Sequence, residues 1–440
     1  MYAPRMLALW CGRRWGLHTG AVARGAMIAV LMVSIAGCGD GPYAHLADRA
    51  EEVRQLAFVD DVPYRTPTPE QFAKEVSHDV DNDWTDEELR DYADTYGRLG
   101  FFDVNLNLRP ILTQSRIDAT GAFYSPSQKT ITFVGAPKAG TVIHEYVHAL
   151  QDQHFGITEY DSGAGSTDEF LARRAVIEGD AELAEARFLV EEDGGSLDTI
   201  DYDQYFDSWI QYSAKYLDDS PYPLFFRAYT SFVYTYGLIY SAANLFGDSP
   251  QVRPPAPPPY AWNRQDELFT TRPPATTAQI LSAPGGSVLV DINIPAVLGT
   301  DLDYVNSDTL GAWYTYLLFR PVPAAPGVLD LAGDRVLVAR VKATGAAGVV
   351  WVSAWQYEQA AETAAEALRA LHAGTDEPVV VERRQNRVVL ARNFPASMTA
   401  ALINAAFAQT ATARRAGRLP LHAREAIRHV DDRAVRRARL

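Results

Sequence analysis

The alternation of apolar and polar residues divides the chain into a longer helical part and a shorter part that mixes strands with helices. Apolar residues recur at helical spacing over 46–58, 84–98, 140–155, 166–190, 203–218 and 223–246. The helix over 84–98 should begin at Asn82 or Asp83, and Ser166 with Glu169 forms a capping-box pattern. Between 101 and 134 the pattern alternates, and it predicts a hairpin of Gly121–Tyr124 and Thr130–Val134.

The pattern changes after a proline-rich segment at 250–274. Strands are predicted at 288–290, 336–341, 349–355, 379–382 and 387–391, and helices at 357–372 and 396–406. The fold class is therefore α+β. We expect a mainly helical domain with a small N-terminal sheet over 66–285 and a smaller α+β unit over 286–410.

Composition and charge narrow the class of protein. The chain has 440 residues, of which 47% are hydrophobic, and its formal net charge is -15. These values are typical of a soluble globular protein with about two structural units, and they argue against a nucleic-acid partner. The two cysteines, Cys11 and Cys38, both lie near the N-terminus. The body of the protein therefore has no disulfide framework.

The N-terminal segment is typical of an export signal. Several arginines precede the apolar run Ala26–Ala36, and the run ends in Ile35-Ala36-Gly37-Cys38, which resembles the lipobox of bacterial lipoproteins. The resemblance implies that residues 1–37 are a removed signal peptide, that Cys38 carries lipid, and that 38–65 is a tether. The protein would then be anchored in the cell envelope, facing the periplasm or the cell surface. A plain secretory signal and an N-terminal membrane helix are the alternatives.

The C-terminal segment 411–440 is predicted to be a basic tail. Its last 27 residues, 414–440, hold nine arginines and three acidic residues. It is either a solvated helical tail or a segment that docks on anionic phospholipid or on the protein's own acidic surface.

The motif His144-Glu145-Tyr146-Val147-His148 carries the candidate chemistry. Residues four apart share one face of a helix, so His144 and His148 can hold one Zn²⁺ at about 2.0–2.1 Å each. Glu145 lies one residue on and can take a proton from a zinc-bound water. The alternative is an ordinary helix with two surface histidines and a chance glutamate.

A catalytic zinc needs a third protein ligand and one open position. Glu178 is the favoured candidate, because it follows an apolar run and precedes Gly179, which suggests an inward carboxylate beside a tightly packed backbone. Glu182, one turn later, can support a ligand histidine through a hydrogen bond. The two glutamates can also exchange these roles. Asp180 and Glu185 are expected to point elsewhere and to be solvated.

These residues resemble the gluzincin branch of zinc metallopeptidases, the peptidase MA-like group. The likeness rests on His144-Glu-x-x-His148 and on Glu178-Gly-x-Ala181, and it covers roughly residues 85–245. It implies a zincin-like fold, zinc bound by the two histidines and Glu178, and Glu145 as general base. The phrase His144–Phe155 also resembles a group of uncharacterised bacterial proteins of this type.

A peptidase also needs a donor for the oxyanion and a place for the peptide backbone. Tyr236 is the candidate donor, although an aromatic stripe at helical spacing is more often part of a core. The strand Thr130–Val134 offers a possible edge for an extended substrate. No specificity pocket is evident in the sequence.

The sequence therefore predicts a membrane-anchored zinc endopeptidase that hydrolyses peptide bonds through a zinc-bound water activated by Glu145. The alternative is a catalytically inactive lipoprotein that keeps the fold as an envelope binding or scaffold protein. If the site is correct, the ligand atoms of His144, His148 and Glu178 should lie within about 4 Å of one another.

Overall fold

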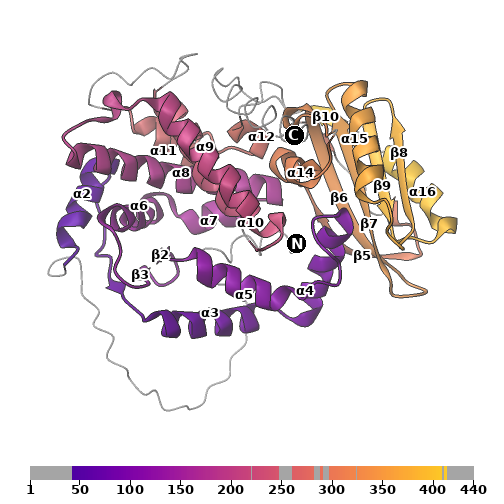
Figure 1. Cartoon of the computed structure of the whole chain (residues 1–440), viewed down its shortest axis with the longest axis horizontal. Helices are drawn as coiled ribbons and strands as arrows, with labels where there is room; N and C mark the ends of the chain where they lie inside the picture. The colour runs from indigo at the N-terminus through magenta and orange to yellow at the C-terminus, as the bar shows by residue number, and fades with distance from the viewer. Residues whose placement is uncertain are drawn as a thin grey trace, which may run out of the picture.

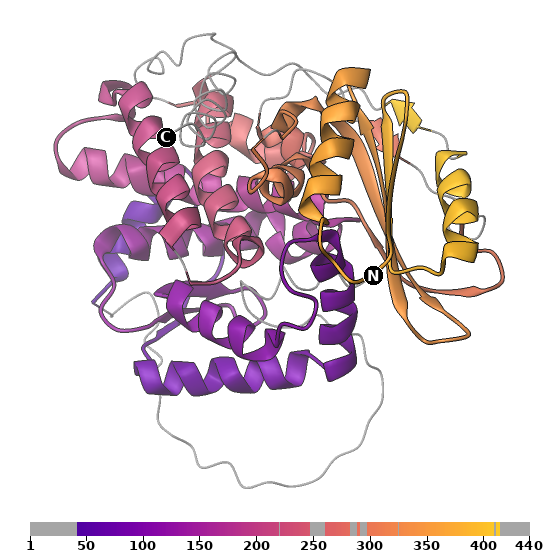
Figure 2. The same cartoon turned by 45° about the vertical axis from the view of Figure 1, so that its right-hand side comes forward.

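The computed structural model describes residues 42–219, 221–246, 260–281, 288–290, 297–323, 325–408 and 411–413. A helical part lies beside a part built on a five-stranded sheet, as Figure 1 shows from one side and Figure 2 after a turn of 45°. The predicted α+β class is confirmed. Cys38, the predicted signal peptide and residues 414–440 lie outside the described residues. Among the helices that the structure describes, none has the length and apolarity to cross a bilayer.

The helical part is arranged around one long central helix. Its helices are α2 (Ala44–Arg54), α3 (Pro69–Asp83), α4 (Asp86–Tyr92), the π-helical turn η2 (Ala93–Gly97), α5 (Leu108–Ala119), α6 (Ala139–Phe155), α7 (Ile157–Ser162), α8 (Thr167–Glu192), the 3₁₀ turn η3 (Leu197–Thr199), α9 (Tyr202–Asp219), α10 (Leu224–Phe246), α11 (Asn263–Phe269) and α12 (Thr277–Ile280). The central helix α8 packs against α2, α6 and α10. It meets α10 most closely at two glycines, where a Cβ on Gly179 would lie 2.1 Å from the carbonyl carbon of Gly237.

A small mixed sheet lies beside α6. Its order is β1-β3-β2, with β1 (Tyr64–Arg65) parallel to β3 (Thr130–Phe133), and β2 (Ala122–Ser125) antiparallel to β3. The predicted hairpin is confirmed. The edge available to a partner belongs to β2, however, because β3 pairs on both sides, so the expectation of an edge at Thr130–Val134 was wrong.

The segment expected to be a tether contains part of the packed body. Helix α2 lies against α6 and α8, and its residues Ala50, Val53 and Arg54 are fully buried. The strand β1 follows at residues 64–65. Residues 44–65 therefore contribute to the helical part.

The C-terminal part is an antiparallel sheet of order β5-β6-β7-β9-β8 with helices on both faces. Its elements are β5 (Leu302–Asp308), α14 (Gly311–Phe319), the 3₁₀ turn η4 (Val328–Asp330), β6 (Leu331–Val341), β7 (Ala347–Trp355), α15 (Glu358–Leu371), β8 (Val379–Arg384), β9 (Arg387–Arg392) and α16 (Ala396–Phe407). One sheet face packs with α14 and α15 into a core shared with the helical part, and the other packs against α16. Strand β4 (Val288–Val290) pairs with β10 (Ala411–Ala413), so the first residues of the predicted tail lie in a strand.

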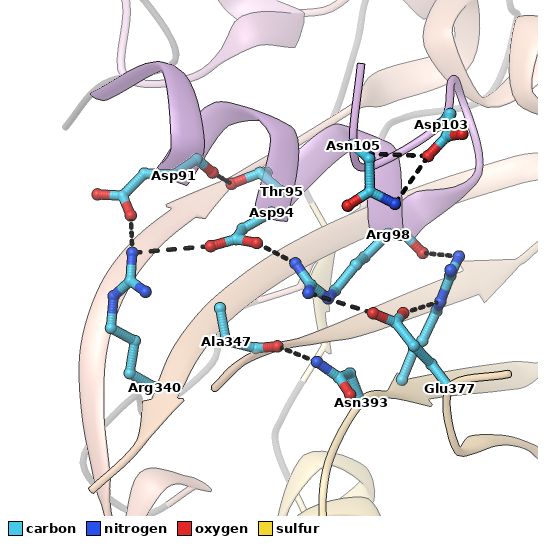
Figure 3. Close-up of polar contacts among 11 residues, drawn as sticks. Asp91, Asp94, Thr95, Arg98, Asp103, Asn105, Arg340, Ala347, Glu377 and Asn393 are labelled. Carbon is cyan, nitrogen blue, oxygen red and sulfur yellow. Dashed lines mark hydrogen bonds and ion pairs between the residues drawn. The ribbon is translucent and has the colours of Figure 1, made fainter. Parts of the chain in front are cut away.

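Alternating charges join the two parts, as Figure 3 shows. Arg340 of β6 pairs with Asp91 and lies 3.7 Å from Asp94. Asp94 pairs with Arg98, whose Nη2 lies 3.2 Å from Glu377 in the loop before β8. Because no residue of this row lacks an opposite charge, the joint is held by a continuous network as well as by the shared core.

The helix predicted over 84–98 differs from the prediction at its start and in its second half. It begins after Thr85, whose hydroxyl accepts from the backbone N–H of Glu88 in a capping box. Its second half is the π-helical turn η2. The elements that were not predicted include β1, α3, α5, α7, α11, α12, α14 and β5, and α11 lies within the predicted proline-rich segment.

Candidate metal centre

Two helices bring the three predicted ligands together. His144 and His148 lie one turn apart on α6, Glu178 lies on α8, and all three are buried. The Nε2 atoms of the two histidines are 3.0 Å apart. Oε2 of Glu178 lies 3.5 Å from Nε2 of His144 and 3.2 Å from Nε2 of His148. The expected convergence is confirmed.

These distances fit a metal ion. Ligand atoms placed about 2.0–2.1 Å from a tetrahedral metal lie about 3.3 Å from one another. The three measured separations, 3.0, 3.2 and 3.5 Å, bracket that value. The buried group of His144, His148 and Glu178 can therefore hold a metal ion.

The electrostatics of the cluster favour a cation. Burial alone would lower the pKa of His144, but hydrogen bonds to Glu178 and Glu185 raise it well above its usual value. Burial alone would raise the pKa of Glu178, but the neighbouring histidines hold it well below its usual value. The cluster thus stabilises a positive charge between these side chains. A metal ion bound there would take the place of the proton that His144 otherwise holds.

Gln151, one turn after His148, determines which ring nitrogen of that histidine carries the hydrogen. The Nε2 group of Gln151 donates to the carbonyl of Ile177 at 2.9 Å and to Oδ2 of Asp180 at 2.8 Å. With both amide hydrogens engaged, Oε1 faces Nδ1 of His148 at 2.9 Å. The reverse amide orientation would place Oε1 against two acceptors. Nδ1 therefore carries the hydrogen, and Nε2 is left free for a metal.

Asp180 is held in turn by a buried arginine. Arg54 of α2 donates through Nε to Oδ2 of Asp180 at 2.8 Å, and through Nη2 to Asp266 of α11 at 2.7 Å. The side chains of Arg54 and Asp180 have no solvent exposure. The expectation that Asp180 is solvated was wrong, because α2 covers this face of α8. Oδ2 of Asp180 thus accepts from both Arg54 and Gln151.

The other histidine has two carboxylates on its far ring edge. Nδ1 of His144 lies 3.5 Å from Oε1 of Glu182 and 3.4 Å from Oε2 of Glu185. Glu182 thus lies across the imidazole from Glu178, where it cannot share a metal with His148. Burial raises the pKa of Glu182 to about 8. Glu185 was expected to be solvated, but it also faces the histidine, with 22% of its side chain exposed.

Glu145 lies in the wall of the same cavity as His148 and Glu178. It is 6% exposed, and Oε2 has no hydrogen-bond partner within the described parts of the chain. Burial raises the pKa of Glu145, while a hydrogen bond from the backbone of Tyr124 in β2 acts in the opposite direction. A carboxylate with one open oxygen beside the candidate metal position is suited to proton transfer.

The cavity itself is narrow, with a volume of about 70 Å³. Its walls come from β2, α6, α8 and α10, and its polar groups include those of Arg174, Tyr229 and Tyr234. We call this space the metal cavity. Tyr236, the predicted oxyanion donor, packs instead against Phe232 and Trp313, and it is absent from the residues that line the cavity.

Gln151 and Arg54 were not predicted from the sequence, and only Gln151 has a local signal in it. Gln151 follows His148 by three positions, which places it on the same helix face. Arg54 carries no such local signal, because its partner Asp180 is 126 positions away.

Comparisons with protein-family models, curated proteins and solved structures found no match to this chain.

Proposed function

We propose that this chain is a zinc-dependent peptidase. One observation carries the proposal: two histidines and a glutamate converge at tetrahedral spacing beside Glu145, whose carboxylate faces the same cavity. Two imidazoles and one carboxylate are a common donor set of catalytic zinc sites, and they leave a fourth position open. When bound, zinc polarises a carbonyl oxygen and lowers the pKa of a water molecule.

The side chains of the cavity take complementary roles. Gln151 keeps the hydrogen of His148 on Nδ1, and Glu182 and Glu185 do the same for His144. Glu145 accepts a proton from the attacking water and passes it to the leaving amine. Arg174, Tyr229 and Tyr234 supply N–H and O–H groups at the cavity wall that can donate to the oxyanion.

A strand edge beside the site supports a peptide as substrate. Ala122, Phe123 and Tyr124 of the edge strand β2 line the metal cavity. An extended peptide can add to such an edge through main-chain hydrogen bonds, which hold it whatever its side chains are. The scissile carbonyl would then lie over Glu145 and the three ligands.

The cellular place of the activity is proposed from the sequence alone. The apolar run before Cys38 and the sequence Ile35-Ala36-Gly37-Cys38 favour lipidation of Cys38 and attachment to the cell envelope. Mass spectrometry of the protein recovered from membranes should find an acylated N-terminal Cys38. An unmodified N-terminus at another residue would contradict the lipid anchor.

The peptidase proposal is tested by zinc content and hydrolysis measured on the same samples. The wild-type chain should hold one zinc and cleave denatured casein. Glu145→Gln should keep the metal and lose about 10²–10⁴-fold in rate. Glu159→Gln, an exposed glutamate of α7, is the matched control and should keep both properties.

Two outcomes would contradict parts of the proposal. Full zinc with unchanged hydrolysis in Glu145→Gln would exclude Glu145 as the base. Full zinc without hydrolysis of casein by the wild-type chain would favour the inactive scaffold protein in place of a peptidase.

A further inference from the structure

A second cavity opens beside the metal cavity, between α9 and α10. It has a volume of about 510 Å³, and we call it the aromatic cavity. Four rings of α9, from Tyr205, Trp209, Tyr212 and Tyr216, line it at the spacing of one helix face. Figure 1 shows α9 beside α10, which supplies the opposite wall.

Small residues keep this space open. Ser213 of α9 and Ser231 of α10 are hydrogen bonded to each other through their hydroxyl groups, and Thr235 lies one turn further along α10. Because these side chains are short, they leave room in front of the rings of α9, and Tyr234 is the large side chain that α10 contributes to the lining. Tyr212 remains 64% exposed, which is unusual for a large aromatic residue in a folded protein.

The aromatic cavity carries no charge. Every residue that lines it is alanine, serine, threonine, tyrosine or tryptophan, although the chain as a whole has a net charge of -15. A neutral apolar side chain gains contact area with the rings here. A charged side chain would give up solvation without meeting an opposite charge among the residues that line the cavity.

The two cavities lie next to each other and share part of their walls. Ala119, Thr230 and Tyr234 line both of them. The ring of Tyr234 lies 6.0 Å from the ring of His144, so the shared wall begins next to a candidate metal ligand. One residue of extended peptide spans about 3.3–3.6 Å. A side chain in the aromatic cavity therefore belongs to a residue within about two positions of a carbonyl placed over the metal site.

We propose that the aromatic cavity is the specificity subsite of this chain, and that it takes a large neutral side chain, aromatic or leucine, within two residues of the scissile bond. This inference rests on the proposed function, because it names the substrate class of the same site. The enzyme would then cleave unfolded or extended peptides close to apolar residues. The rings Trp209 and Tyr212 determine the preference, and Tyr234 forms the border with the metal cavity.

The test uses the full zinc-loaded chain carrying Glu145→Gln, so that binding is measured without cleavage. The probes are acetylated and amidated pentaalanine peptides with Phe, Leu, Asp or Lys at the central position. Calorimetry should show that the Phe and Leu peptides bind about tenfold or more tightly than the Asp and Lys peptides. Adding Trp209→Ala or Tyr212→Ala should remove most of that difference. Tyr304→Ala, an exposed tyrosine on β5, is the matched control and should preserve it.

The outcomes separate the subsite from the reaction. Equal binding of the Phe and Asp peptides, or an equal loss in Tyr304→Ala, would overturn the subsite. Hydrolysis by the wild-type chain that is indifferent to the central residue would also overturn it while leaving the peptidase intact. Selective binding of the Phe peptide without hydrolysis by the wild-type chain would support the subsite and contradict the peptidase.

Discussion

Oε1 of Gln151 lies 2.9 Å from Nδ1 of His148, on the ring edge opposite the nitrogen that faces Glu178. The contact links a candidate metal ligand to a buried ion pair in the helical part, because the amide of Gln151 also donates to Asp180, the partner of Arg54. Three helices, α2, α6 and α8, thus determine which nitrogen of His148 is free. The metal affinity of the site should depend on residues that never touch the metal.

Gln151→Leu should weaken zinc binding about 10- to 100-fold, because the imidazole of His148 loses the acceptor that orients it and fixes its hydrogen. Competition with a chromogenic chelator measures the dissociation constant directly. Gln153→Leu on the same helix is the control, since the hydrogen bonds of Gln153 to the described residues join it to the backbone of Val59 and Asp60. Equal zinc affinities in the two variants would show that Gln151 has no orienting role.

The close approach of Gly179 to Gly237 gives a second prediction. A Cβ at Gly179 would overlap backbone atoms of α10, which cannot move aside as a flexible side chain would. Gly179→Ala should therefore push α8 away from α10, lower the free energy of unfolding by about 1–3 kcal/mol, and displace Glu178 next to it. Urea unfolding and zinc titration would measure both effects. Gly121→Ala, with no atom within 4 Å of its Cβ, should change neither.

The candidate site was predictable where its signals are local. The spacing of His144 and His148 follows from helix geometry, and a carboxylate before Gly179 indicated an inward position beside a close backbone. The network behind them was not predictable, because Arg54 and Asp180 meet only once α2 has packed on α8. The expectation that Glu185 is solvated was wrong for the same reason, because its position in the helix does not indicate that α6 packs opposite it.

The elements of the fold were likewise predictable where their sequence signals are local. Amphipathic helices such as α9 and α15 were predicted, because each has one polar face. Helix α14 was not, since it is buried on nearly all sides at the joint and its sequence has no polar face to reveal the period. Strand β5 was obscured by a bulge between Tyr304 and Asn306, which breaks the alternation. Helix α3 was overlooked although Thr68, Pro69 and Gln71 form a complete N-terminal signature.

The charged joint between the two parts gives a third prediction. Glu377 accepts from Nε of Arg392 at 2.7 Å and lies 3.2 Å from Nη2 of Arg98, so Glu377→Gln removes the carboxylate partner of Arg392 and leaves Arg98 with Asp94 alone. We expect the free energy of unfolding to fall by about 1–3 kcal/mol. The exposed pair of Glu382 and Arg384 supplies the control, and Glu382→Gln should stay within about 0.5 kcal/mol of the wild type. Similar values for both variants would mean that the network contributes no more than a surface ion pair.

A fourth prediction concerns pH, through a buried aspartate at the start of α8. Burial raises the pKa of Asp168 to about 7, against hydrogen bonds from the backbone and hydroxyl of Thr277 that act to lower it. Because the pKa in the folded state lies above the unfolded value of 3.8, the folded chain binds more protons in this range. The stability that the group contributes is complete below about pH 4 and is lost as the pH rises through about 7.

Asp168→Asn should remove this part of the pH dependence. Asparagine keeps an oxygen for the two donors of Thr277 but does not ionise. The variant should therefore gain stability relative to the wild type as the pH rises from 4 to 8, by on the order of 2–4 kcal/mol at about 1.4 kcal/mol per pKa unit. Urea unfolding at four pH values measures the difference between the two proteins. Asp303→Asn, at a side chain that is 65% exposed, should run parallel to the wild type. A constant difference between Asp168→Asn and the wild type across this range would show that Asp168 is ionised throughout.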